Sequence, residues 1–178
     1  PGSVLASNSS VNASVTATDS NGNTVTAEAD RGYSVDTSAE ASISLNAIAG
    51  DDILNAAEAA ADVAVSGSVG GDAQEGDTVT LTIGSETYSG AVLAGNTFSI
   101  NVPGSVLATN SSVNASVTAT DSNGNTVTAE ADRGYSVDTS AEASISLDAI
   151  AGDDILNAAE AAADVAVSGS VGGDAQEG

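Results

Sequence analysis

Acidic side chains at short spacings are the groups in this sequence that could do chemistry. The stretch GDDILNAAEAAAD, from Gly50 to Asp62, places Asp51, Asp52, Asn55 and Glu58 close together. Carboxylate and amide oxygens are the ligands that Ca²⁺ prefers, and residues three apart on a helical turn share a face. We expect the four side chains to converge on Ca²⁺. The alternative is a capped helical turn, with one of the two Asp residues as the cap and Glu58 in solvent.

The same acidic stretch occurs twice because the chain repeats itself. Residues 1–76 and 103–178 have the same sequence, except that Ser7 corresponds to Thr109 and Asn46 to Asp148. A match at a fixed period of 102 residues indicates a tandem array of domains. The second copy of the acidic stretch adds four candidate ligands: Asp153, Asp154, Asn157 and Glu160.

Two further loops carry acidic residues. The loop GGDAQEGD contains Asp72, Glu75 and Asp77, and the turn DSNGN contains Asp121 and Asn123. Neither has the spacing of an EF-hand, since the Gly of the turn comes at the fourth position and no Glu stands at the twelfth. We expect both loops to contribute Ca²⁺ ligands. The alternatives are a solvated loop and a hairpin turn capped by its own side chains.

The composition excludes several classes of function. The chain has 25 acidic residues against two Arg, no Lys, no His and no Cys, and its net charge is −23. Nucleic acids and anionic membranes are poor partners for such a chain. Thiol, imidazole and Schiff-base chemistry are excluded, so we expect neither an enzyme nor a small-molecule substrate. No apolar run approaches the ~20 residues of a membrane span, and no signal peptide is visible.

Alternating apolar and polar residues predict short strands separated by turns. An Asn-Gly turn between two alternating runs is a strong hairpin signal. Seven strands at regular spacing favour an all-β fold, an antiparallel β-sandwich of the immunoglobulin type, with a short helical turn between the first two strands. The expected strands are 42–45, 63–69, 78–83, 87–92, 97–102, 113–120 and 126–131, the last with a return through 135–139.

The repeat and the strands together predict the domain limits. We expect a complete domain at 38–139, the last strands of a preceding domain at 1–37 and the first strands of a following domain at 140–178. The two partial domains lack the equivalent of residues 77–102. We therefore expect the sequence to be an excerpt of a longer array, or its two ends to be completed by something that is not in the sequence. The loop after the first strand should lie near Asp138, where the last strand leaves the domain. The opposite pole should face Asp36 of the preceding domain, and we expect Asp138 and Asp36 to add Ca²⁺ ligands at these two poles.

Several segments resemble one known family across the whole period. They are GDDILNAAEA, VSGSVGGDAQEGDTVTLTIG, TYSG, FSINVPGS, ASVTATDSNGN and YSVDTSA. Together they resemble the extender repeats of giant bacterial repeats-in-toxin adhesins, which include biofilm-associated and ice-binding adhesins. The resemblance implies a Ca²⁺-binding immunoglobulin-like domain, secreted by a type I system and strung in tandem. The usual TAP after the final Asp is TSAEA here, which removes a Pro that would have stiffened the linker.

These observations lead to a structural prediction of function. We expect a spacer domain of a secreted adhesin at the bacterial cell surface, made rigid by several Ca²⁺ ions per repeat, with adjacent repeats of the same chain as its partners. The alternative is an adhesive module that itself contacts a glycan, a protein or a neighbouring cell. Arg31 and Arg133 are the only cations, and we expect each to form a structural ion pair with a nearby acid or to pack its stem against a neighbour such as Tyr135. Alternating Thr, which could match ice, is also normal on half-exposed strands, and ice contact is not expected.

Overall fold

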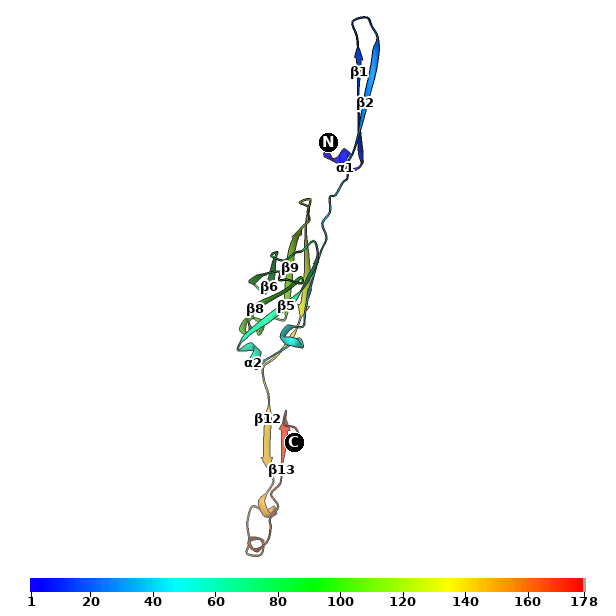
Figure 1. The fold of residues 1–178 in the computed structure, drawn as a ribbon. Coiled ribbons are helices and arrows are strands. Elements are labelled where there is room, and N and C mark those ends of the chain that lie inside the picture. The colour runs from blue at the N-terminus through cyan, green and yellow to red at the C-terminus, as the bar shows by residue number, and fades with distance from the viewer. Residues whose placement is uncertain (178) are drawn as a thin grey trace.

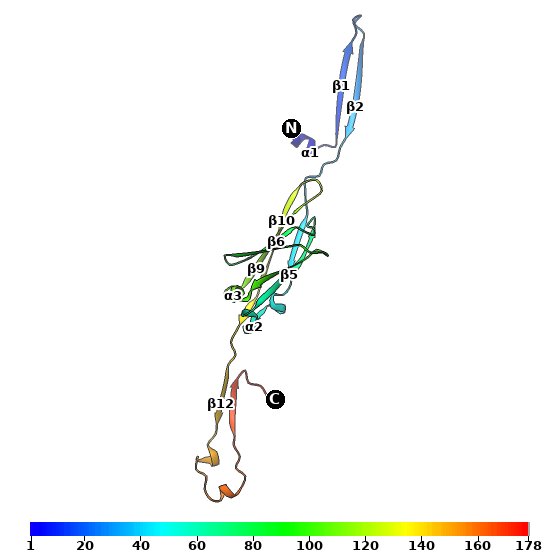
Figure 2. The ribbon, with the colours of Figure 1, turned by 60° about the vertical axis from the view of Figure 1, so that its left-hand side comes forward.

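The computed structural model describes residues 1–177 as an elongated molecule with a hairpin at each end and a β-sandwich between them (Figure 1). The N-terminal hairpin and the C-terminal hairpin lie at opposite ends of the long axis, and a second view shows the same arrangement (Figure 2). Within residues 1–177, no helix is long and apolar enough to cross a membrane. The N-terminal hairpin consists of β1 (Ser10–Thr18) and β2 (Thr24–Gly32), preceded by the short helix α1 (Gly2–Ala6). The C-terminal hairpin consists of β12 (Ala143–Leu147) and β13 (Gly169–Gly173), with the 3₁₀ turns η2 (Ile150–Gly152) and η3 (Glu160–Ala162) between them.

The central sandwich contains two antiparallel sheets, as the alternation predicted. One sheet has the strand order β10-β9-β6-β7, and the other has the order β3-β5-β8. Every strand predicted for the complete domain is present, with ends within a few residues of those expected. The sandwich strands are β3 (Ala41–Leu45), β5 (Asp62–Gly71), β6 (Thr78–Ile83), β7 (Glu86–Ala91), β8 (Thr97–Pro103), β9 (Ser112–Thr120), β10 (Thr126–Gly134) and β11 (Ser136–Asp138).

The core between the two sheets is built mainly from Val, with Ile, Leu and Ala, and Phe98 is its largest fully buried side chain. In β6, alternate residues are fully buried and the residues between them face outward, which is the pattern of a strand with one face on the core. Gly67 of β5 pairs with Phe98 of β8. A Cβ on Gly67 would lie 1.9 Å from the Ser44 carbonyl oxygen and 2.6 Å from the Phe98 ring. This glycine therefore provides the space that the Phe98 ring occupies.

The connection between the first two strands differs from the expected helical turn. It consists of the 3₁₀ turn η1 (Ile48–Gly50), the short strand β4 (Ile53–Asn55) and the single helical turn α2 (Ala56–Ala59). Strand β4 pairs in parallel with β11, the last strand of the domain. Leu54 at its centre is fully buried. Because residues 53–55 are extended and paired with β11, the helix is restricted to the Ala-rich half of the stretch. A second helical turn, α3 (Gly104–Leu107), was not predicted.

The terminal hairpins repeat parts of the sandwich outside it. Strands β1 and β2 pair Ser10 with Gly32, and β9 and β10 pair the equivalent residues in the same register. Every residue of β1 and β2 is exposed. The local sequence therefore specifies the hairpin and its register, whereas burial of its apolar face depends on the rest of a domain.

Candidate functional site

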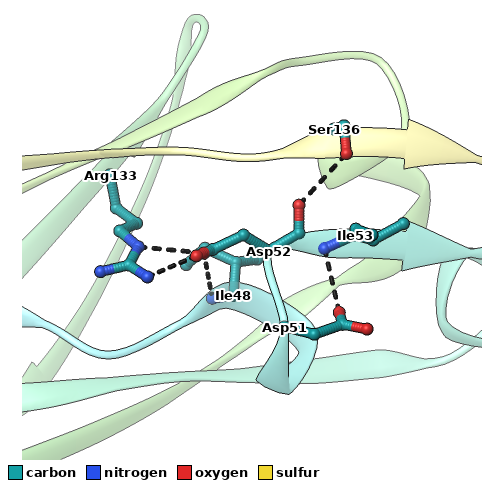
Figure 3. Close-up of polar contacts among 6 residues, drawn as sticks. All are labelled: Ile48, Asp51, Asp52, Ile53, Arg133 and Ser136. Carbon is teal, nitrogen blue, oxygen red and sulfur yellow. Dashed lines mark hydrogen bonds and ion pairs between the residues drawn. The ribbon is translucent and has the colours of Figure 1, made fainter.

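The carboxylate of Asp52 ties the first loop of the sandwich to its last strands (Figure 3). Arg133 of β10 donates to both carboxylate oxygens, with a distance of 3.0 Å between its Nε and Oδ1. The backbone N–H of Ile48 also donates to Oδ1, at 2.9 Å. The carbonyl oxygen of Asp52 accepts the backbone N–H of Ser136 at 2.9 Å. Arg133 thus forms the structural ion pair that the sequence predicted, whereas Arg31 forms none within residues 1–177.

This ion pair shifts the pKa values of both partners. The hydrogen bonds from Arg133, followed by the N–H of Ile48, hold the pKa of Asp52 below its ordinary value. Asp52 in turn raises the pKa of Arg133. Asp52 has a φ of 65°, in the left-handed region that is uncommon for a residue other than Gly. The bonds to Ile48, Arg133 and Ser136 hold the backbone in this conformation.

Asn55, and not Asp51 or Asp52, caps the helical turn that follows. Its Oδ1 accepts the backbone N–H groups of Ala57 at 2.9 Å and Glu58 at 3.0 Å. The Oε2 of Glu58 accepts the N–H of Asn55 at 3.0 Å, which completes a capping box. The alternative considered from the sequence, a capped helical turn, is therefore present, but its cap is Asn55, because the two Asp residues precede a strand and do not stand at the helix start.

The four candidate ligands of the first loop do not meet at one point. Asp51 accepts the N–H of Ile53 at 3.0 Å, Asp52 is bound by Arg133, and Asn55 and Glu58 bind each other's backbone. Among residues 1–177 there is no cluster of three or more acidic side chains that could hold a metal ion by itself. A cation bound at this loop would therefore need further ligands from outside the loop.

Asp138 lies beside this loop, as the predicted topology requires. The parallel pairing of β4 and β11 places Asp138 opposite Asn55. A shallow depression at this point is lined by Asn55, Ala57, Asp138 and Ser140. The Oδ1 of Asp138 faces the N–H of Ser140 at 3.4 Å. We call this end of the sandwich, with Asp51, Asp52, Asn55, Glu58 and Asp138, the trailing pole.

The turn DSNGN lies at the opposite end, which we call the leading pole, and it is capped by its own side chains. The Oδ1 of Asp121 accepts the N–H groups of Asn123 at 2.9 Å and Asn125 at 2.8 Å. Its Oδ2 accepts the side-chain amide of Asn125 at 2.7 Å. These bonds, with the Asn125 amide contributing most, hold the pKa of Asp121 below its ordinary value.

The same turn holds the linker from the preceding repeat. The amide of Asn123 donates to Oδ2 of Asp36 at 2.6 Å. The amide of Asn125 donates to the carbonyl oxygen of Asp36 at 3.3 Å. Asn125 was not among the predicted site residues, although it continues the spacing of two that links Asp121 and Asn123. This junction joins residues that are 87 positions apart, so the pairing depends on the fold of the complete domain.

Most of the remaining candidates bind backbone N–H groups. The Oδ2 of Asp72 accepts the N–H of Glu40 at 2.8 Å, which ties the β5–β6 loop to the start of the domain. Asp77 accepts the N–H of Gln74 at 2.8 Å, and Glu75 is exposed. The C-terminal copy repeats the local bonds of the first loop: Ile155 N–H to Asp153, Ile150 N–H to Asp154, Ala159 N–H to Asn157 and Asn157 N–H to Glu160.

Comparison with known proteins gives matches among solved structures. No protein-family model matches the chain, and no curated protein matches it. A crystal structure of a bacterial immunoglobulin-like domain from the M. primoryensis ice-binding adhesin is 46% identical, with a TM-score of 0.52; the match covers 58% of this chain and all of that domain. The chain belongs to the immunoglobulin-like domains of large bacterial adhesins. This confirms the resemblance and the fold class predicted from the sequence.

Two longer structures of this adhesin class match almost the whole chain. One belongs to a 1.5-MDa bacterial ice-binding adhesin studied for its retention at the host cell surface, with 45% identity and a TM-score of 0.82 over 99% of this chain. The other is a Ca²⁺-stabilised adhesin with which an Antarctic bacterium reaches out and binds ice, with 47% identity and a TM-score of 0.73 over 99% of this chain. The chain spans 58% and 44% of the lengths of these two structures.

Proposed function

We propose that this chain is a spacer segment of a secreted adhesin at the bacterial cell surface, in which Ca²⁺ stiffens each sandwich and its junctions. The observation that carries the proposal is the contact between Asp36 and the turn of Asn123 and Asn125. It means that a linker leaving one repeat is held by side chains of the next. Near-identical repeats joined in this way give length and direction, whereas many copies of one surface are of little use to an enzyme.

The available ligands are chemically suited to Ca²⁺. The chain offers carboxylate, amide and carbonyl oxygens without any thiol or imidazole, and Ca²⁺ takes six to eight such oxygens in flexible geometry. At the trailing pole, Asp51 and Glu58 each use one oxygen for a backbone N–H. Asp138, beside Asn55, adds a third carboxylate. These residues would hold a cation together with groups from the following repeat.

The junction at Asp36 offers a second set of oxygens. Two carboxylates, Asp36 and Asp121, lie on either side of the amides of Asn123 and Asn125. The nitrogen and oxygen of an Asn amide exchange places by rotation about one bond. Both amides would therefore be able to present oxygen to a cation. The half-buried Asp72 and Asp77, with the exposed Glu75, lie in the nearby β5–β6 loop and would add charge.

Electrostatics explain why a divalent ion would matter for stiffness. A net charge of −23 on 178 residues opposes any compact, end-to-end arrangement of domains. When bound, Ca²⁺ neutralises carboxylates that otherwise repel one another across a junction. A site that exists only in the folded state stabilises it by about 2.7 kcal/mol at a hundredfold excess of ion over the dissociation constant. Several such sites per repeat would add to this value.

An adhesive role for the sandwich itself has less support. Direct binding of a glycan or protein favours a contiguous apolar or aromatic patch. Among the described residues of the complete domain, the large exposed hydrophobic side chains are Ile53, Leu93 and Val137, each about half exposed or less. They lie on different strands and loops and form no aromatic surface. Contact with a ligand is therefore better assigned to another part of an adhesin.

The experiment that tests the spacer proposal compares the protein with Ca²⁺ and with a chelator. Thermal melting should show a higher melting temperature with Ca²⁺. Small-angle scattering should show a longer and stiffer particle. Mg²⁺ at the same concentration serves as the control for ionic strength and general charge screening. If neither the melting temperature nor the particle length responds to Ca²⁺, the proposal is wrong.

A further inference from the structure

The turn DSNGN of the sandwich places an Asn directly before a Gly that the turn requires. Gly124 has a φ of 89°, in the left-handed region that Gly enters without steric cost. Among the Asn residues of the chain, only Asn21 and Asn123 are followed by Gly. The shape of the turn therefore fixes a Gly next to Asn123, and this neighbour has a chemical consequence.

An Asn side chain before Gly can react with the backbone nitrogen that follows it, and Asn is among the thermolabile residue types. Hydroxide removes the proton of that nitrogen, which then attacks Cγ of the Asn. A C–N bond forms, the Cγ–Nδ2 bond breaks, and Nδ2 takes a proton from water and leaves as ammonia, which regenerates the hydroxide. One water molecule opens the resulting succinimide ring at either carbonyl and gives Asp or isoaspartate. The net change is amide plus water to carboxylic acid plus ammonia.

The Gly124 nitrogen is open to this chemistry. A Cβ built on Gly124 would meet no atom within 4 Å, so the space that another side chain would fill is accessible to solvent. Asn123 is exposed as well. The N–H of Gly124 donates to the carbonyl oxygen of Asp121 at 3.2 Å, which is the long end of the range for such bonds. The attacking nitrogen is therefore neither shielded nor tightly held.

Asn125 of the same turn differs in each of these respects. It precedes Thr126, whose β-branched side chain crowds the following nitrogen. Its amide donates to Oδ2 of Asp121 at 2.7 Å and to the carbonyl oxygen of Asp36 at 3.3 Å, and the residue is half-buried. The reactive Asn of this turn is therefore Asn123.

Asp36 of the linker holds the side chain of Asn123. The Asn123 Nδ2 donates to Oδ2 of Asp36 at 2.6 Å. An ionised carboxylate only accepts hydrogen bonds, so the amide nitrogen must be the atom that faces it. This bond fixes the orientation of the amide and opposes the rotation that brings Cγ to the Gly124 nitrogen.

We propose that Asn123 is a deamidation site protected by the linker, and that its conversion makes an opening of the junction permanent. While Asp36 is bound, the amide is restrained. When the linker leaves, the amide is free to react. The product carries a carboxylate in place of the donor, so the two groups that met at 2.6 Å can only accept and repel each other. Without a cation the junction does not close again.

The two Arg residues make the site easy to follow. Cleavage after each Arg gives the fragments 1–31, 32–133 and 134–178, so Asn21 and Asn123 fall in different fragments. The whole chain is incubated in chelator at mildly alkaline pH, sampled over days and measured by mass spectrometry. Conversion changes the mass by the difference between an amide and a carboxylic acid, and further fragmentation distinguishes Asn123 from Asn125.

We expect conversion at Asn123, none at Asn125 over the same period, and a mixture of Asp and isoaspartate. The mixture is the signature of the ring, because direct hydrolysis of the amide gives Asp alone. A product without isoaspartate would overturn the ring step. A chain in which Asn123 converts no faster than Asn125 would overturn the proposal.

The protection is tested with Asp36→Ala in the whole chain. Loss of the bond should raise the rate of conversion at Asn123 by roughly two- to tenfold, the factor that corresponds to one net hydrogen bond. Asp138→Ala is the matched control, because it removes the same charge from the equivalent linker position at the trailing pole. Conversion at Asn21 should be the same in all three proteins. An equal or slower rate at Asn123 in Asp36→Ala would show that the linker does not protect it.

The permanence is tested with Asn123→Asp, which supplies the product directly. Amide relaxation measured by NMR in chelator should show greater mobility of the linker at Val35 and Asp36 than in the wild type. Ser122→Asp adds the same charge to the same turn, from an exposed residue that has no bond to Asp36 within residues 1–177, and should leave the linker unchanged. A linker that is equally ordered in Asn123→Asp and the wild type would overturn this part.

Thermal melting in chelator confirms that each variant keeps a folded sandwich. The site lies in an exposed turn, so the melting temperature should stay close to that of the wild type. The spacer proposal is judged separately, by the response of the unmodified chain to Ca²⁺. A failure of the deamidation experiments therefore leaves that response, and the conclusion drawn from it, unaffected.

Discussion

Arg133 and Asp52 hold the last long strand of the sandwich to the loop that follows its first strand. They are 81 residues apart. Arg133 is the only cation of residues 38–139, and its guanidinium group engages both oxygens of one carboxylate. In a chain with 25 acidic residues, many carboxylates could have competed for it. The loop geometry selects Asp52, because its left-handed backbone and its bond from Ile48 aim the carboxylate at β10.

The first prediction concerns this ion pair. Arg133→Ala and Asp52→Ala should each lower the melting temperature in chelator. The double variant should lose little more than the worse single variant, because the two side chains act as one unit. The half-exposed position limits the size of the effect and makes it weaker at high salt. Arg31→Ala removes the same charge from a terminal hairpin and should leave melting of the sandwich unchanged. Additive losses would show that the pair is not coupled.

The second prediction concerns acid. The pKa values of Asp52 and Asp121 are lowered in the folded protein, so each carboxylate stabilises the fold above its unfolded pKa of about 3.9. This stabilisation is lost as the pH falls below that value through the folded pKa. Protonation also relieves the general repulsion of the chain, which acts in the opposite direction. The measurement is therefore the difference in unfolding free energy between the wild type and Asp52→Asn.

That difference should be constant near neutral pH and should shrink as the pH falls below about 4, since the wild-type carboxylate then becomes neutral as well. Asp19→Asn is a matched control. The pKa of Asp19 is also lowered, chiefly by the side chain of Asn23, but Asp19 lies in a terminal hairpin and should not affect unfolding of the sandwich. A difference that does not change with pH would contradict the prediction.

The third prediction tests the helix cap. Asn55→Ala removes the acceptor for the N–H groups of Ala57 and Glu58 and should cost about 1 kcal/mol of unfolding free energy in chelator. Asn55→Asp keeps the acceptor and should cost less. Asn157→Ala makes the same change in the C-terminal copy and should leave the sandwich unaffected. Urea denaturation measures all three variants. Equal costs for Asn55→Ala and Asn55→Asp would mean that the cap contributes little.

The strands were predictable because alternation is a local signal. The hairpin of β9 and β10 inside the sandwich and its copy, the hairpin of β1 and β2 outside it, pair equivalent residues in the same register. The pairing of β4 with β11 was not predictable, because three residues are too few to show a period and the partner strand lies more than eighty positions away. The sequence likewise predicted an ion pair for Arg133 but could not choose Asp52. That choice depends on the left-handed backbone at Asp52, a conformation that is uncommon for residues other than Gly.

The candidate site was predictable only as a location. Topology placed Asp138 beside the first loop and Asp36 beside the turn of Asp121, and both neighbours are found there. The detailed bonds differ from the expected convergence, because most of these carboxylates, although not Glu75, first satisfy a nearby backbone N–H. Buried or half-buried N–H groups require such partners. The number of oxygens left for a cation therefore depends on loop conformation, which residue spacing does not determine.

The fourth prediction concerns core packing. Gly67→Ala places a Cβ 1.9 Å from the Ser44 carbonyl oxygen and against the Phe98 ring, so the strand or the ring must move. The expected loss is at the upper end of about 1–3 kcal/mol, measured by urea denaturation. Gly169→Ala, the same change in the C-terminal copy, should leave the sandwich unaffected. An unchanged unfolding free energy for Gly67→Ala would show that β3 and β5 are farther apart than described.

The last prediction tests whether Glu58 and Asp138 serve one Ca²⁺ site. Glu58→Gln preserves the capping box, because Gln also accepts the N–H of Asn55, but it removes the charge. Asp138→Asn likewise removes one negative charge, at the end of β11. Each variant should reduce the rise in melting temperature caused by Ca²⁺, and the double variant should lose no more than either alone. Glu160→Gln, in the C-terminal copy, is the matched control and should retain the full response. Independent, additive losses would place the two carboxylates at separate sites.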